Sequence, residues 1–86
     1  MQPYCSKLGI SNSRKTPLEV LVEPWAFDYT LMSGEELQIV AFGESNAPYF
    51  NLTEWDDSIQ VWCEATDSFQ VMQGDRELEC GHQRRD

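Results

Sequence analysis

The sequence is poor in the residues from which catalytic and metal sites are usually built. It contains one histidine, His82, and three widely spaced cysteines, Cys5, Cys63 and Cys80, with no CxxC pair. An odd number of scattered cysteines does not make a disulfide framework, and without paired ligands a structural zinc site is not expected. A Cys–His nucleophilic pair would need the tail around His82 to fold back. We therefore predict reduced thiols in a cytoplasmic protein, with no metal and no cofactor.

Basic residues and long apolar runs are also scarce. Residues 17–80 hold 14 acidic residues and one basic residue, hence a net charge of −13, and the whole chain carries −9. Such a body repels the phosphates of nucleic acids and the anionic surfaces of membranes. No stretch of 18 apolar residues is present, and the residues after Met1 do not resemble a signal peptide. The charge is typical of a soluble protein that binds neither nucleic acid nor membrane.

What the chain has instead is a period of two in its apolar residues. Apolar and polar side chains alternate in short segments rich in β-branched and aromatic residues, with turn residues between them, and no window shows a helical stripe. The pattern predicts an all-β fold, a small antiparallel β-sandwich or partly open barrel of six to seven short strands. Parallel pairs are not expected, because they need long crossovers. The segments are 18–22, 27–31, 37–42, 49–55, 59–65, 69–71 and 76–80.

The same pattern sets the domain boundaries. Residues 1–16 carry Lys7, Arg14 and Lys15 but no acid, and show no periodicity. They are predicted to be a flexible basic arm, followed by one β domain over 17–80 and a flexible tail over 81–86.

The face of the strands that points away from the predicted core is not uniformly polar. It carries Leu21, Val40, Phe42, Trp62 and Met72. A contiguous apolar patch often marks an interaction surface. Three interpretations stay open: both faces of a curled sheet are covered, the patch is a homodimer interface, or it lines a ligand groove floored by Trp62 and Phe42. A β-bulge would shift the phase and move these residues inward.

Aromatic residues lie beside carboxylates at several points of the chain. Trp25, Tyr29 and Trp55, with Glu23 and Asp28, have the composition of a sugar-binding platform, in which rings stack on sugars and carboxylates accept hydroxyl hydrogen bonds. The competing interpretation is that the rings fill a small core.

Aspartates cluster in predicted turns at Asp56, Asp57, Asp67 and Asp75. Oxygen ligands of this kind hold Ca²⁺ in some proteins, but no EF-hand spacing is present. We expect these aspartates to bind their own turn backbone.

A short element resembles a known family. The segment Leu31–Leu37, Leu-Met-Ser-Gly-Glu-Glu-Leu, is similar to the Pro-Gly-Glu turn between strands of cupin-like β-barrels, with Ser33 in the place of proline. Residues 23–41 also resemble a pattern of small uncharacterised bacterial proteins. The resemblance implies a cupin-like β fold. The clustered histidines and the glutamate of the cupin metal motif are absent, so it implies neither a metal nor an oxygenase or isomerase activity.

The function predicted from these observations is a non-catalytic binding or protein-interaction module, which self-associates or binds another protein. The alternatives are a small-ligand or carbohydrate-binding domain that uses the Trp, Tyr and carboxylate residues, and a minimal cupin-like enzyme.

Overall fold

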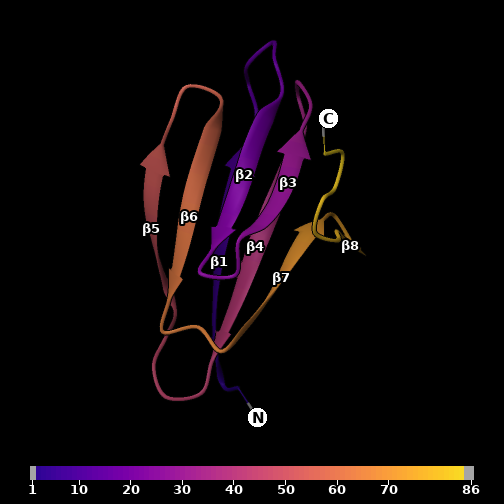
Figure 1. Cartoon of the computed structure of the whole chain (residues 1–86). Helices are drawn as coiled ribbons and strands as arrows, with labels where there is room; N and C mark the ends of the chain where they lie inside the picture. The colour runs from indigo at the N-terminus through magenta and orange to yellow at the C-terminus, as the bar shows by residue number, and fades with distance from the viewer. Residues whose placement is uncertain (1, 85–86) are drawn as a thin grey trace.

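The computed structural model describes residues 2–84, which form two four-stranded β-sheets stacked face to face (Figure 1). Sheet A has the order β1-β4-β7-β8 and sheet B the order β3-β2-β6-β5. The predicted all-β sandwich is therefore confirmed, and the sheets do not close into a barrel. Residues 2–84 contain no helix long and apolar enough to cross a bilayer. The strands are β1 (Tyr4–Ser11), β2 (Leu18–Glu23), β3 (Phe27–Leu31), β4 (Glu36–Gly43), β5 (Tyr49–Glu54), β6 (Ser58–Glu64), β7 (Ser68–Gln73) and β8 (Arg76–Glu77).

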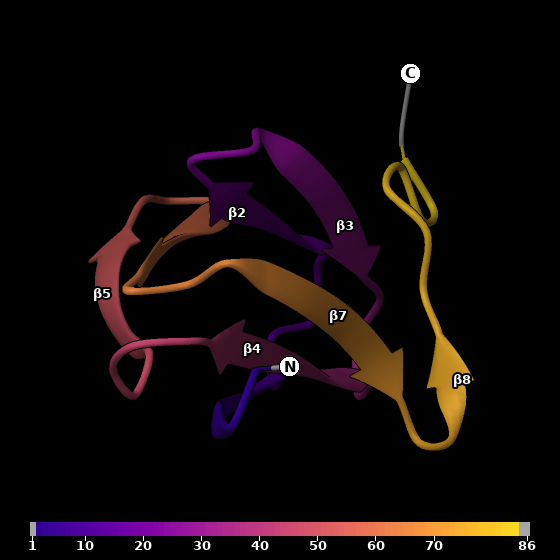
Figure 2. The same cartoon turned by 90° about the horizontal axis from the view of Figure 1, so that it is seen from below.

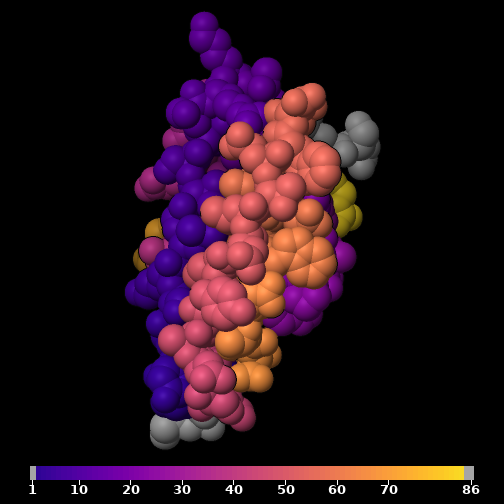
Figure 3. Space-filling model, turned by 90° about the vertical axis from the view of Figure 1, so that its left-hand side faces the viewer, coloured from indigo at the N-terminus to yellow at the C-terminus, as the bar shows by residue number. Residues whose placement is uncertain are grey.

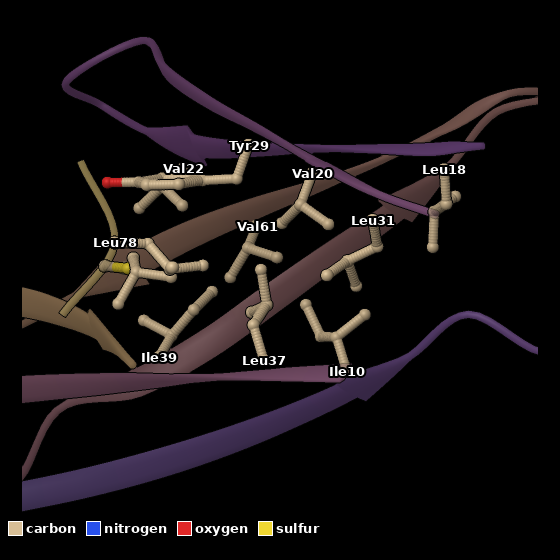
Figure 4. Close-up of a cluster of buried hydrophobic side chains, with 12 residues drawn as sticks. Ile10, Leu18, Val20, Val22, Tyr29, Leu31, Leu37, Ile39, Val61 and Leu78 are labelled. Carbon is tan, nitrogen blue, oxygen red and sulfur yellow. The ribbon is translucent and has the colours of Figure 1, made fainter. Parts of the chain in front are cut away.

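The core lies between the sheets and follows the alternation of the sequence. In β2 the side chains of Leu18, Val20 and Val22 are buried while Glu19 is exposed. Strands β4 and β6 likewise contribute every second residue to this core, because successive side chains of a strand point to opposite faces. Figure 4 shows the resulting cluster, in which side chains from both sheets meet. Full burial of one such aliphatic side chain contributes roughly 1.5–3 kcal/mol, so this layer dominates the stability of the fold.

The predicted flexible arm is wrong for the segment Tyr4–Ser11, which forms β1 at the edge of sheet A. The strand pairs antiparallel with β4, from Tyr4 opposite Gly43 to Ser11 opposite Glu36. Its inner phase carries only two large aliphatic side chains, Leu8 and Ile10, and Ile10 reaches the core. Two apolar positions are too few for a visible period, so pairing with β4 rather than local pattern makes this strand. Met1 lies outside the described residues.

One strand pair runs against the expectation of antiparallel pairing. At the centre of sheet B, β2 and β6 are parallel, with Val20 beside Ile59 and Val22 beside Val61. A parallel pair needs a long connection, and here the chain between the two strands supplies it by forming β3, β4 and β5. Because β4 belongs to sheet A, this connection passes through the opposite layer of the sandwich.

A buried amide joins the loops at one end of the sandwich. The side chain of Asn12 is almost completely buried, and its Nδ2 donates to the carbonyl oxygens of Thr16 and Leu31, both at 2.9 Å. Its Oδ1 accepts from the Arg14 backbone N–H at 2.9 Å. Its own backbone N–H donates to the carbonyl of Glu35. Asn12 therefore ties the β1–β2 loop to the end of β3 and the β3–β4 turn.

Candidate functional site

A cleft of about 420 Å³ opens between the two sheets at the edge formed by β3. Phe27 and Tyr29 of β3 line one wall, and Phe69 and Val71 of β7 line the other. The segment 77–80, which follows the β7–β8 turn, completes the lining. Figure 2 shows β8 and this segment rising beside β7 and β3. The cleft exists because β8 contributes only two residues, so sheet A ends early at this edge.

Three aromatic rings meet at this cleft. The rings of Trp25 and Phe69 are tilted with centroids 4.5 Å apart, and the rings of Phe27 and Phe69 meet edge to face at 5.6 Å. Both separations fall in the range of favourable aromatic pairs. Trp25 is partly buried against the core, and Phe27 remains 38% exposed. Phe27 therefore presents ring surface to whatever occupies the cleft.

Acidic groups surround the aromatic walls. Glu77 and Glu79 line the cleft and are exposed, and no basic residue of the described part of the chain, 2–84, lines it. Burial, with smaller contributions from the nearby Cys80 and Glu77 side chains, raises the pKa of the Tyr29 phenol to about 12. Tyr29 is therefore a neutral phenol at physiological pH. In Figure 4 its hydroxyl oxygen lies at the opposite end of the core cluster from Leu18.

The chain after β8 closes over the outer side of β3. The backbone N–H of Thr30 donates to the carbonyl of His82 at 2.8 Å, and that of Gly81 donates to the carbonyl of Asp28 at 2.6 Å. Two guanidinium nitrogens of Arg84 donate hydrogen bonds to the Asp28 carboxylate, at 2.6 and 2.9 Å. The predicted flexible tail is thus wrong for residues 81–84, while residues 85–86 lie outside the described part of the chain. The tail covers an edge that would otherwise present free backbone groups.

The contact between Arg84 and Asp28 should be visible in the titration of the Asp28 carboxyl. Hydrogen bonds from Arg84 hold the pKa of the Asp28 carboxyl below its ordinary value of 3.8, so Asp28 stabilises the fold at pH above about 4 and loses this contribution as the pH falls through its lowered pKa. We expect Arg84→Ala to move the Asp28 pKa back up, measured by NMR of the carboxyl carbon between about pH 2 and pH 6. Arg76→Ala is the matched control, since Arg76 bonds Gln73 instead. An Asp28 pKa equally low in both variants would contradict the assignment.

Of the predicted ligand-binding residues, the structure brings three to this edge of the sandwich and leaves two away from it. Tyr29 lines the cleft, Trp25 packs on its Phe69 wall, and Asp28 anchors the tail beside it. Glu23 instead accepts from the Ala26 N–H in the β2–β3 turn and from the side-chain amide of Gln60 on β6. Trp55 follows β5, at the opposite edge of sheet B from β3.

The predicted interface residues do not share one face. Leu21 and Trp62 belong to β2 and β6 of sheet B, whereas Val40, Phe42 and Met72 belong to β4 and β7 of sheet A. All five are in the outward phase of their strands, so the two groups lie on opposite outer surfaces of the sandwich. Val40 is buried, and its neighbours in register carry the long side chains of Lys7 and Gln70. No single apolar patch is formed by the whole set.

Sequence reasoning named Tyr29 but missed Phe27 and Phe69, which line the cleft with it. Phe27 and Phe69 have the inward phase and were expected in the core, yet each lies close to a strand end, where the sandwich opens. The sequence around Leu78 held the remaining signal of this site: Glu77 and Glu79 flank a leucine that is buried in the structure. Cys63 is buried as expected, and burial, with a smaller contribution from Glu64, raises its pKa to about 11.

Residues 2–84 contain no cluster of three or more His, Cys, Asp or Glu that could hold a metal ion. Asp67 does not follow the expectation that the turn aspartates bind their own turn backbone: it accepts from the backbone N–H of Glu44 in the β4–β5 connection, at 2.8 Å. The three thiols are free, with Cys5 and Cys80 exposed.

Comparison with known proteins identifies no relative of this chain. The likeness of residues 31–37 to cupin-like barrels stays a prediction. No family model, no curated protein and no solved structure matches this chain significantly.

Proposed function

We propose that this chain is a non-catalytic binding module whose cleft between β3 and β7 holds a small organic cation with an apolar body. The observation that carries the proposal is the lining of this cleft, in which aromatic rings of Phe27, Tyr29 and Phe69 stand beside two carboxylates, with no basic residue of the range 2–84 among them. Aromatic faces attract cations, and carboxylates reinforce the attraction without a competing positive charge. The volume of the cleft suits a small ligand.

A carbohydrate ligand is less well supported. Sugar platforms need coplanar or facing exposed rings, and the two tryptophans suggested for such a platform, Trp25 and Trp55, lie at opposite edges of sheet B. The rings of Trp25 and Phe27 both pack against Phe69, so they are not spread for stacking on a sugar.

The proposal is tested by comparing a cation with its neutral isostere. Choline and benzyltrimethylammonium should quench or shift the emission of Trp25, which contacts Phe69, whereas 3,3-dimethyl-1-butanol should have little effect. Binding is also followed by amide NMR shifts, which should concentrate in β3, β7 and residues 77–80. Equal binding of the neutral compound, or shifts centred elsewhere, would reject the proposal.

The matched variant is Phe27→Ala, since Phe27 is 38% exposed and its loss spares the buried core. It should weaken benzyltrimethylammonium binding by about two- to thirtyfold, the range of one cation–π contact. Met32→Ala removes a similarly exposed side chain, 37%, just after β3 and should leave the affinity unchanged.

A further inference from the structure

Among residues 2–84, the outer edge of β5 has no partner strand. Within the described part of sheet B, β5 pairs with β6 alone. The Trp55 N–H donates to the Ser58 carbonyl at 2.8 Å, which makes these two a hydrogen-bonded pair. Hydrogen-bonded and non-hydrogen-bonded pairs alternate along antiparallel strands, so Thr53 and Asn51 also face β6 with their backbone groups. The N–H and C=O groups of Phe50, Leu52 and Glu54 therefore point away from the sheet.

The other edges of the sandwich are protected by means that β5 lacks. The edge of β1 carries Lys7, a charged residue of the kind that discourages strand addition. The edge of β3 is covered by hydrogen bonds from Gly81 and to His82. The edge at β8 is only two residues long. In contrast β5 offers six residues without lysine or proline, and among residues 2–84 no segment other than β6 pairs with it.

The side chains around this edge are apolar and unusually exposed. Tyr49 is 58%, Leu52 51% and Trp55 57% exposed, although Leu52 has the inward phase that is buried in other strands. Figure 3 faces this side of the molecule and shows the atoms of β5 between the indigo atoms of the N-terminal part of the chain and the orange atoms of β6. The strand approaches β1 at its start, where the Ser6 hydroxyl donates to the Pro48 carbonyl at 2.6 Å. A partner strand would shield Leu52 and satisfy the free backbone groups together.

The charge around the edge is almost entirely negative. Three acids, Glu54, Asp56 and Asp57, lie at the end of β5 and in the turn after it. At the beginning of β5, Glu64 of β6 lies opposite Tyr49. The guanidinium that reaches this end, from Arg14, bonds the Asp56 carbonyl. Acids therefore flank both ends of the exposed edge. A second copy of the chain would bring another charge of −9 against it, so charge complementarity selects a cationic partner.

We propose that the free edge of β5 binds an extended basic peptide segment of another protein, which adds a strand to sheet B with apolar side chains against Leu52 and Lys or Arg side chains toward the flanking acids. The free backbone groups of β5 would form the hydrogen bonds to the peptide, and the flanking acids would make the site specific for basic peptides. This surface lies at the edge of sheet B opposite the β3 cleft, so it is separate from the site of the small cation.

The test uses a capped peptide of alternating lysine and valine and the full-length protein. Binding should shift amide resonances of Phe50, Leu52 and Glu54 and perturb the emission of Trp55, and it should weaken severalfold when salt is raised from about 0.02 M to about 0.5 M. The same peptide N-methylated at alternate residues cannot pair along one edge and should bind at least about tenfold more weakly. A peptide with glutamate in place of lysine should not bind. Equal binding of the N-methylated peptide, or shifts away from β5, would overturn the proposal.

Two variants of equal charge change complete the test. Leu52→Lys places a protective lysine on the free edge and should reduce binding of the lysine–valine peptide by about tenfold or more. Gln70→Lys adds the same charge on an exposed position of β7 in sheet A and should leave binding within about twofold. Light scattering on the unmodified protein and Leu52→Lys detects the competing occupant: a dimer that Leu52→Lys dissociates would show that a second copy, not a basic peptide, takes this edge.

Discussion

Replacement of Asn12 by alanine is expected to lower the free energy of unfolding by about 2–4 kcal/mol, because it removes the partner of the buried Leu31 carbonyl and of two part-buried backbone groups. The carbonyl of Leu31 lies in the buried end of β3 and loses the Nδ2 donor at 2.9 Å. The Thr16 carbonyl and the Arg14 N–H lose their partners as well. The loss should appear as a lower urea midpoint with an unchanged m-value.

The matched control for this variant is Asn51→Ala. Asn51 also donates a side-chain hydrogen bond, to Glu64 at 3.3 Å, but does so on the exposed face of β5. Its removal should change the free energy of unfolding by no more than about 0.5 kcal/mol, as is usual at surface positions. If both variants unfold at the urea concentration of the unmodified protein, the buried amide is not a structural junction.

Substitution of Gly43 is expected to have the second large effect. A Cβ at this position would lie 2.5 Å from the Asn46 carbonyl oxygen and 2.7 Å from the Ala65 carbonyl oxygen. Both atoms are backbone, so the β4–β5 and β6–β7 connections would have to move apart to admit a methyl group. We expect Gly43→Ala to cost about 2–3 kcal/mol of unfolding free energy, in the upper part of the range for overpacked sites.

Gly9 provides the internal comparison for this steric effect. A Cβ built there meets no atom within 4 Å. Gly9→Ala should therefore be neutral or stabilise the protein by up to about 1 kcal/mol, because it restricts the unfolded chain without a clash. Thermal and urea unfolding of the two variants side by side separates close packing at Gly43 from the general effect of replacing glycine in a strand. Similar midpoints for both would contradict the expected clash.

The alternation of the sequence predicted much of the fold because the physics behind it is local. In β2 and β6 the buried residues occupy every second position, as any strand with one face in a core requires. The turn at Ser33–Gly34 was equally visible, since Gly34 takes a positive φ of 85° that glycine adopts without strain. What the pattern could not show was β1, whose inner face carries only Leu8 and Ile10, or the parallel pairing of β2 with β6, which depends on contacts remote in sequence.

The candidate site was less accessible to sequence reasoning for a related reason. Alternation tells whether a side chain points in or out, but not how far along the sandwich it lies or to which sheet it belongs. Phe27 points inward like Val22 opposite it, yet the first is 38% exposed and the second fully buried. The outward residues Trp62 and Phe42 were grouped together because phase does not record that one lies on β6 and the other on β4. The pairing of Phe27 with Phe69 depends on the tertiary fold alone.

The parallel neighbours β2 and β6 also constrain the order of events while the chain is being synthesised. Leu18 emerges from a ribosome long before Ser58, and until β6 follows, one side of β2 has no backbone to pair with. The nascent chain can form the β2–β3 hairpin early, but that hairpin exposes Val20 and Val22 until the later half arrives. Pairing between strands this distant in sequence is slow relative to hairpin formation. The apolar side chains that stay exposed in the meantime are a surface that chaperones bind.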